Sequence, residues 1–371
     1  MKIAYFVHDL GDPAVRRRVL MFRAGGAQVV LVGFRRGAEP IAEVAGAPAH
    51  DLGQTHNARL AHRAAATVRQ RLAAGRWRDV VAGADAVVAR NLEVLWIAEA
   101  ARRAGAPRAR RVYECLDVHR LMASDGLPGK ILRGLEHRLL GACDLLILSS
   151  PAFEREYFRP RHGLALPTLL VENKLLSLDG HAARPVLART AGPPWRIGWF
   201  GALRCRKSLT LLADLAARHP GLVEVVMRGR PAHDEFDDFD AQVAAAPGVS
   251  YLGPYVAEDL PALYGDVHFT WAVDFYEEGL NSSWLLPNRL YEGGYFGAPA
   301  LALRGVETGR WLAGHGSGVL FDDLSTQVAP FLQGLDARAY AALEAAAFAM
   351  PWADLACDAD ACVELVAAVC G

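Results

Sequence analysis

Short apolar runs alternate with longer helical patterns along most of this 371-residue chain. In the first half the apolar runs have the length of buried strands and lie at residues 2–7, 29–34, 86–89, 112–115, 145–148 and 169–171. The helical patterns between them lie at residues 14–24, 59–73, 92–103, 130–140 and 152–158. Such strand–helix alternation predicts a parallel, doubly wound sheet with helices on both faces.

The alternation is interrupted at residues 177–194, a segment rich in turn-forming residues such as Asp179-Gly180 and Pro193-Pro194. We interpret it as a linker, because at this length two domains are expected rather than one core. Strands are then expected at 196–200, 223–227, 249–252, 267–272, 300–303 and 318–321, and helices at 208–218, 236–245 and 258–264. The predicted fold class is α/β, with Rossmann-like domains at residues 1–185 and 186–371. The last helix, about 352–371, is expected to pack back on the N-terminal domain.

The composition is that of a folded globular protein, with 52% hydrophobic and 22% charged residues. There is no apolar run of membrane-spanning length, and the first residues resemble a strand rather than a signal peptide, so a cytoplasmic location is expected. The six cysteines show no CxxC pairing. They are interpreted as reduced, structural thiols, and no metal site is expected.

Charge is distributed unevenly along the chain. Residues 1–190 contain 29 Lys+Arg and 18 Asp+Glu, whereas the remainder contains 11 and 23, so the two parts carry +11 and −12 and sum to −1. This asymmetry predicts that the first part faces an anionic surface. A membrane is favoured over nucleic acid, for which no motif is present.

One predicted helix carries much of this positive charge together with Leu60, Val68, Leu72 and Trp77, a pattern typical of helices that rest on anionic headgroups. The alternative is an arginine-rich, solvated face. The cations concerned are Arg59, Arg63, Arg69, Arg71, Arg76 and Arg78.

Residues 286–299 are predicted to form a short helix that leads into a buried strand. Asn288 is the expected N-cap, the helix begins near Arg289, and Glu292 is expected in its first turn. A carboxylate beside free amides can hold sugar hydroxyls next to a phosphate. The alternative is a surface Glu292 that only complements the helix dipole.

A second candidate site follows the first strand of the C-terminal half. Arg204, Arg206 and Lys207 precede a helix whose expected N-cap is Ser208, an arrangement suited to a diphosphate. Arg206 stands where a P-loop requires glycine, which excludes a Walker motif, and no Gly-x-Gly-x-x-Gly follows any strand, which disfavours an oxidoreductase. The alternative is a solvated basic loop.

Together these two stretches resemble the GT-B glycosyltransferases, in particular family 4 and related transferases of bacterial polysaccharide assembly. The resemblance places Gly201 on the family's turn glycine and Lys207 on the lysine that binds the donor diphosphate. Ala202 stands in the position of the family's arginine, and Arg204 is placed to supply that charge. The resemblance also implies that Arg289 lies near the diphosphate.

The later family motif has two glutamates separated by seven residues. Glu292 matches the second glutamate, which in the family holds the nucleotide ribose. Trp284 stands at the first position, a departure from the pattern. The candidates to replace that glutamate are Asp274, Glu277 and Glu278.

The resemblance implies that the N-terminal domain binds the acceptor. Asp117 and His119, in the segment 114–119 that offers two carboxylates and an imidazole after a strand, are the preferred groups to receive the acceptor's proton. Asp9, in the loop 8–12, is the second candidate. The alternative for each is a structural hydrogen-bond network.

The function expected is sugar transfer from a nucleotide diphosphate sugar, UDP-linked, to a lipid-linked or polysaccharide acceptor at the inner face of the cell membrane. No cofactor is expected, and no metal, because Asp238-Phe239-Asp240, which has the Asp-x-Asp spacing of metal-dependent transferases, lies in an acidic helix. A sugar-nucleotide epimerase of the same fold and a non-catalytic nucleotide-sugar-binding protein are the rival interpretations.

Overall fold

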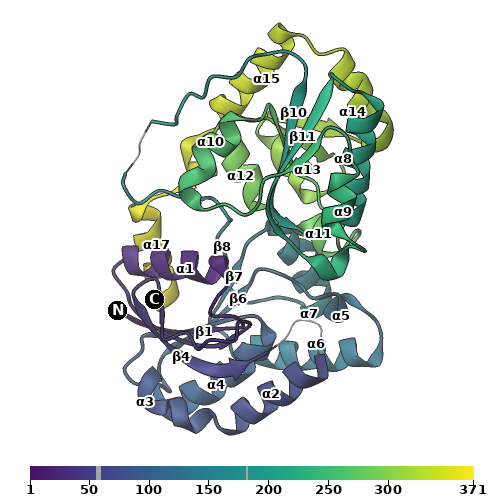
Figure 1. The fold of residues 1–371 in the computed structure, drawn as a ribbon. Helices are drawn as coiled ribbons and strands as arrows, with labels where there is room; N and C mark the ends of the chain where they lie inside the picture. The colour runs from purple at the N-terminus through teal and green to yellow at the C-terminus, as the bar shows by residue number, and fades with distance from the viewer. Residues whose placement is uncertain (56–59, 181–182) are drawn as a thin grey trace. The chain divides into compact units, whose positions relative to one another are not determined.

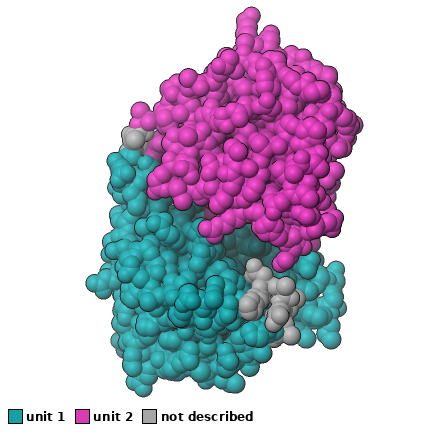
Figure 2. Space-filling model, viewed as in Figure 1, with its two compact units in different colours: residues 1–172, 176–180, 357–371 teal, residues 173–175, 181–356 magenta. Residues whose placement is uncertain are grey.

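The computed structural model describes residues 1–55, 60–180 and 183–371. The chain divides into two compact units, which Figure 2 shows in different colours. Unit 1 comprises residues 1–172, 176–180 and 357–371, and unit 2 comprises residues 173–175 and 181–356. Each unit is α/β and is built on its own sheet, as predicted. Among the residues that the structure describes, every helix is too short or too polar to span a bilayer.

Unit 1 is built on an eight-stranded sheet with the order β3-β4-β2-β1-β5-β6-β7-β8. Its strands are β1 (Lys2–Val7), β2 (Gln28–Arg35), β3 (Glu43–Val44), β4 (Ala47–Gln54), β5 (Ala86–Arg90), β6 (Arg110–Cys115), β7 (Leu145–Leu148) and β8 (Thr168–Leu170). All neighbouring strands are parallel except β3 and β4. Parallel pairing requires crossover helices, which is why the sequence alternates.

The helices of unit 1 cover both faces of this sheet (Figure 1). They are α1 (Pro13–Ala24), α2 (Leu60–Leu72), α3 (Arg78–Val81), α4 (Leu92–Gly105), α5 (Arg120–Ala123), α6 (Leu127–Leu140), α7 (Arg159–His162) and α17 (Ala359–Cys370), with a 3-10 turn at Ala74–Trp77 and a π-helical turn at Phe153–Phe158. The alternate residues Ile3, Tyr5 and Val7 of β1 pack in one core with α1 and α17. The last helix of the chain therefore belongs to unit 1.

The β3–β4 hairpin was not predicted from the sequence. Its two-residue turn, Ala45-Gly46, has positive φ at both positions, 50° and 75°, the geometry that suits a tight hairpin. The segment lacks the β-branched and aromatic residues that mark strands. Pairing with β2 stabilises it instead.

Unit 2 has a six-stranded parallel sheet with the order β12-β11-β10-β13-β14-β15. Its strands are β10 (Trp195–Leu203), β11 (Val223–Pro231), β12 (Val249–Tyr251), β13 (Phe269–Trp271), β14 (Ala300–Leu303) and β15 (Val319–Phe321). Its helices are α8 (Arg206–Arg218), α9 (Phe239–Ala244), α10 (Leu260–Gly265), α11 (Asn281–Trp284), α12 (Asn288–Tyr295), α13 (Glu307–Gly314), α14 (Leu324–Gln333), α15 (Ala337–Ala349) and α16 (Trp352–Leu355), with 3-10 turns at His233–Glu235 and Ala257–Asp259. Two short strands, β9 (Leu175–Leu176) and β16 (Ala356–Cys357), lie where the chain passes between the units.

Two cores in unit 2 flank its sheet. One contains Trp195 and Trp199 of β10 with residues of α8 and α14, and the other contains Phe200 of β10 with residues of α10 and the end of α12. Figure 1 shows α8 and α14 on the side of this sheet opposite α10 and α12.

The linker predicted at 177–194 contains no helix or strand in its described part, yet two of its arginines contact the ends of helices. Arg184 donates to the backbone oxygens of Gly294 and Tyr295, the latter at 2.9 Å. Arg189 donates to those of Tyr264 at 2.9 Å and Phe296 at 2.7 Å. Cations suit helix C-termini, so these contacts fix α10 and α12 against the sheet.

Candidate functional site

The strand order of unit 2 reverses between β10 and β13, and open parallel sheets bind ligands at such a point. Gly201 lies near the carboxyl end of β10 with φ of 104°. A Cβ added there would meet no atom closer than the Tyr255 hydroxyl oxygen, at 3.9 Å. The backbone at Gly201 therefore leaves room for a ligand to approach closely.

Arg289 is the buried cation of this site. It lies in the first turn of α12, is only 8% exposed, and donates from Nη2 to the backbone oxygen of Val273 at 2.7 Å. Its Nε is buried and has no hydrogen-bond partner. Burial lowers the pKa of Arg289, and Asp274 opposes that effect. Burying a guanidinium with an N–H that has no acceptor costs free energy, unless a ligand supplies that acceptor. The ligand expected at this position is therefore an anion.

Glu292 lies one helical turn further along α12. Its Oε2 accepts a hydrogen bond of 2.9 Å from the hydroxyl of Tyr264, which is fully buried. Burial, followed by the charge of Glu292, raises the pKa of Tyr264. Tyr264 therefore remains a donor and orients the carboxylate.

Tyr255 belongs to the same neighbourhood. Burial raises its pKa, and the charges of Glu292 and Arg289 also act on it. Neither Tyr255 nor Tyr264 could be predicted as a site residue from the sequence, because nothing in their local patterns indicates which carboxylate they face.

Lys207 and Arg204 lie beside this site, but both are engaged by carboxylates. Lys207 Nζ lies 2.8 Å from Glu278 Oε2 and over the ring of Phe275. Arg204 Nη2 lies 3.2 Å from Asp274 Oδ2. Of the carboxylates considered as replacements for the missing glutamate, Glu278 thus pairs with Lys207 and Asp274 pairs with Arg204.

Three predictions about helix starts were wrong by small margins. Asn288 is exposed and is the first residue of α12, whose N-cap is Pro287. Glu292 is consequently in the second turn of α12, not the first. Ser208 lies inside α8, where its backbone N–H donates to the sulfur of the N-cap Cys205 at 3.3 Å. The side chain of Ser208 is used elsewhere, since its oxygen accepts from the indole of buried Trp271.

The candidate acceptor residues lie at the carboxyl edge of the unit 1 sheet. Asp9 follows β1, and its Oδ1 accepts from the backbone N–H of Gly11 at 3.0 Å. Asp117 and His119 follow β6 and are both exposed. His119 caps α5, because its Nδ1 accepts from the backbone N–H of Leu121 at 3.2 Å. Partial desolvation of the ring, followed by the charge of Arg63, lowers the pKa of His119.

This hydrogen bond determines the role that His119 can play. At neutral pH the ring is uncharged, and since Nδ1 accepts, its proton lies on Nε2. His119 can therefore donate to a ligand from Nε2. It is not arranged to take a proton, so Asp117 and Asp9 are the better candidates for that step.

Glu114, expected as a carboxylate exposed beside Asp117, is instead fully buried. It accepts from Arg18 Nε at 2.7 Å, from Arg90 Nε at 2.9 Å and from the hydroxyl of Tyr5. Burial would raise the pKa of Glu114, but Arg90 and Arg18 outweigh it and lower the pKa to about 2. Glu114 is part of the interior, because it precedes the end of β6 by one residue.

Trp77, expected on a membrane-facing helix, is also buried, at 9% exposure, and lies beside His50 with ring centroids 5.8 Å apart. Helix α2 ends at Leu72, and Trp77 follows in a separate turn. Arg59 of the same predicted helix lies outside the described residues.

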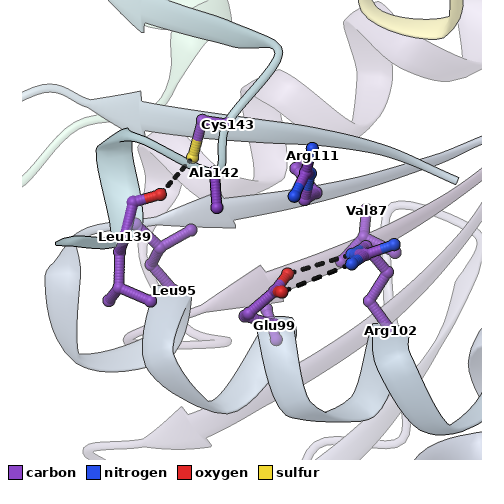
Figure 3. A pocket seen from close by; sticks show the side chains of 9 residues that line it. Val87, Leu95, Glu99, Arg102, Arg111, Leu139, Ala142 and Cys143 are labelled. Atoms are coloured by element: carbon purple, nitrogen blue, oxygen red, sulfur yellow. Dashed lines mark hydrogen bonds and ion pairs between the residues drawn. The ribbon is translucent and has the colours of Figure 1, made fainter. Parts of the chain in front are cut away.

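A small cavity lies between α4, β5, β6 and α6 of unit 1 (Figure 3). Its volume is about 10 Å³, which suits at most one water molecule. Glu99 and Arg102 face each other across its edge at 2.9 Å. It has no room for a sugar or nucleotide. Within residues 1–55, 60–180 and 183–371, no group of three His, Cys, Asp or Glu side chains has a metal-binding arrangement.

Comparison with known proteins identifies the fold. No family model matches the chain. Anabaena HepE, solved in complex with UDP and glucose, has a TM-score of 0.70 at 17% identity and covers 99% of this chain and 98% of its own. Sucrose-phosphate synthase of Thermosynechococcus elongatus has a TM-score of 0.69 at 13% identity and covers 100% and 95%. These likenesses show that the chain has the GT-B fold, as the sequence resemblance predicted.

The particular family follows from a closer relative. The succinoglycan biosynthesis protein ExoL of Rhizobium meliloti is 46% identical over 347 residues, which cover 92% of this chain and 86% of ExoL. The chain belongs to the ExoL family.

Proposed function

We propose that this GT-B glycosyltransferase transfers a hexosyl group from a UDP-sugar to a lipid-linked or polysaccharide acceptor in exopolysaccharide synthesis. The observation that carries the donor assignment is Arg289, whose buried Nε lacks a partner at the β10–β13 reversal, one turn from Glu292. The succinoglycan role of ExoL and the UDP and glucose bound to HepE support the pathway and the nucleotide. We place the protein at the inner face of the cell membrane.

In the proposed reaction an acceptor hydroxyl oxygen bonds to the anomeric carbon while the bond from that carbon to the diphosphate oxygen breaks. The electron pair leaves with UDP, and Arg289 and the free amides at the start of α8 stabilise the developing charge. Lys207 and Arg204 contribute after exchanging their carboxylate partners for the diphosphate. Glu292, oriented by Tyr264, accepts from the ribose hydroxyls. Asp117 or Asp9 receives the acceptor's proton.

Replacing Glu292 with alanine is expected to weaken UDP binding at least tenfold, because it removes one or two charged hydrogen bonds worth roughly 1.5–3 kcal/mol each. Isothermal titration calorimetry with UDP measures this. Glu224→Ala, which removes an exposed glutamate paired with Arg196 in the same unit, serves as the control and should bind UDP like the parent. Equal UDP affinity in the parent and Glu292→Ala would refute the ribose assignment.

His119→Asn tests the acceptor side. Asparagine can still cap α5, but it lacks the ring Nε2, so the acceptor KM should rise by roughly tenfold for one lost hydrogen bond. UDP-sugar hydrolysis without acceptor should not change. The measurement compares initial rates over an acceptor series in parent and variant, and an unchanged acceptor KM would remove His119 from the site.

The reaction itself is tested with a panel of UDP-sugars and a lipid-linked glycan fraction, by following UDP release. Release that depends on the acceptor, with the sugar recovered in the glycan, is expected. Conversion of a UDP-sugar without acceptor would identify an epimerase instead. Tight UDP binding with no turnover at all would indicate a binding protein.

A further inference from the structure

Two helices of unit 1 expose aliphatic side chains to solvent. On α6, Leu127 is 72% exposed and Ile131 is 63% exposed. On α2, Val68 is 43% exposed and Leu72 is 82% exposed. Each pair has the i, i+4 spacing that places both side chains on the same helix face. Both helices pack against α4 (Figure 1).

The charges that these two helices themselves expose have one sign; Asp125, which precedes α6 and is also exposed, pairs with Arg161 at 3.0 Å. The only acid on α6 is Glu136, which is fully buried and accepts from the hydroxyls of Tyr113 at 2.9 Å and Tyr157 at 2.6 Å. The exposed charged side chains of the same helix include Lys130 and Arg138. Helix α2 contains no acid at all in its thirteen residues. Both helices thus present aliphatic groups and cations, and no carboxylate, to the solvent.

Two other exposed aliphatic side chains, Val363 and Val256, lie beside acidic residues. Val363 on α17 is 53% exposed, but Asp360 and Glu364 are its neighbours on that helix. Val256 in unit 2 is 60% exposed and precedes Glu258 and Asp259. Such positions would be repelled by an anionic surface, whereas α2 and α6 would be attracted to it.

We propose that unit 1 docks on an anionic lipid surface through α6 and α2, with Leu127 and Ile131 inserted among the headgroups and the cations of both helices against the phosphates. This inference rests on the membrane location proposed above and specifies the surface. It differs from the sequence-based expectation, which involved α2 and Trp77 and did not include α6.

Docking through α6 would place the membrane close to the candidate acceptor residues. Helix α5 begins directly after its cap His119 and packs against α6. A membrane held at α6 would bring a lipid-linked acceptor close to Asp117 and His119.

Vesicle flotation tests the proposal with the full-length protein and vesicles of phosphatidylglycerol and phosphatidylethanolamine. Leu127→Ser/Ile131→Ser should lower the bound fraction roughly tenfold at low salt, because it removes the apolar insertion. Lys130→Glu/Arg138→Glu should lower it by a similar factor, because it removes the electrostatic attraction to the phosphates. Val68→Ser/Leu72→Ser should have a similar effect. The matched control Val363→Ser should float like the parent. Vesicles of pure phosphatidylcholine should retain little parent protein.

The proposal is overturned if the parent fails to float with the anionic vesicles at low salt, if the α6 variants float as well as the parent, or if Val363→Ser loses as much binding as they do. UDP binding by each variant shows that it is folded. The two proposals can also be separated: a parent that floats but binds no UDP contradicts the donor assignment and supports the docking surface. The charge-reversal variant alters only exposed positions, so it decides the matter if a serine variant does not fold.

Discussion

Arg289→Met is expected to lower UDP-sugar turnover by at least ~100-fold, since two charged hydrogen bonds of roughly 1.5–3 kcal/mol each would be lost. The stability of the free protein should change by no more than about 1 kcal/mol. Arg289 makes one hydrogen bond, to Val273, while burial lowers its pKa, so the folded protein without ligand gains little from its charge. Steady-state kinetics and urea unfolding with and without UDP measure the two effects.

The control for Arg289→Met is Arg304→Met, which removes a largely exposed guanidinium paired with Asp322 in the same unit. This variant should keep full activity and the stabilisation that UDP confers. If Arg289→Met unfolded several kcal/mol more easily without ligand and yet bound UDP like the parent, Arg289 would be a structural residue. The donor site would then have to be sought at Arg204 and Lys207.

Glu114→Gln is expected to destabilise unit 1 by about 3–5 kcal/mol, because it leaves Arg18 and Arg90 buried without a compensating charge. Since the pKa of Glu114 is lowered to about 2 from an ordinary value of 4.5, its contribution is complete above pH 4.5 and is lost as the pH falls toward 2. Urea unfolding at pH 7 and at low pH checks both statements.

The control for Glu114→Gln is Asp214→Asn, which removes an exposed ion pair with Arg218. Its effect should stay within about 0.5 kcal/mol. The difference between Glu114→Gln and the parent should shrink as the pH is lowered. A difference that does not depend on pH would show that Glu114 acts through packing rather than charge.

Most of the fold could be predicted, because hydrophobic periodicity reports directly which side of an element is buried. The runs 2–7 and 300–303 are observed as β1 and β14 with the predicted bounds. The β3–β4 hairpin could not be predicted, because a strand held by its neighbours needs no strong propensity of its own. Helix starts were misplaced because Pro287 and Cys205 end the preceding extended segments one and three residues before the expected caps.

The candidate site was harder to predict than the fold. A motif indicates which residues can meet a ligand, but it does not show what each side chain meets in the ligand-free protein. Lys207 was selected as a free cation, and it is paired with Glu278. Glu114 was selected with Asp117 as an edge carboxylate, but it lies within β6 and is buried in an ion cluster with Arg18 and Arg90.

The sequence by itself determined the α/β class, the division into two sheets, the stretch that contains Arg289 and Glu292, and the basic character of the first part. These properties depend on local periodicity, spacing and charge count. The tertiary structure alone decided that Tyr264 orients Glu292, that Arg289 keeps an unused donor, and that α6 exposes Leu127 and Ile131 while burying Glu136. Each of these depends on contacts between residues distant in the chain or on which helix face packs inward, and no local pattern encodes such contacts.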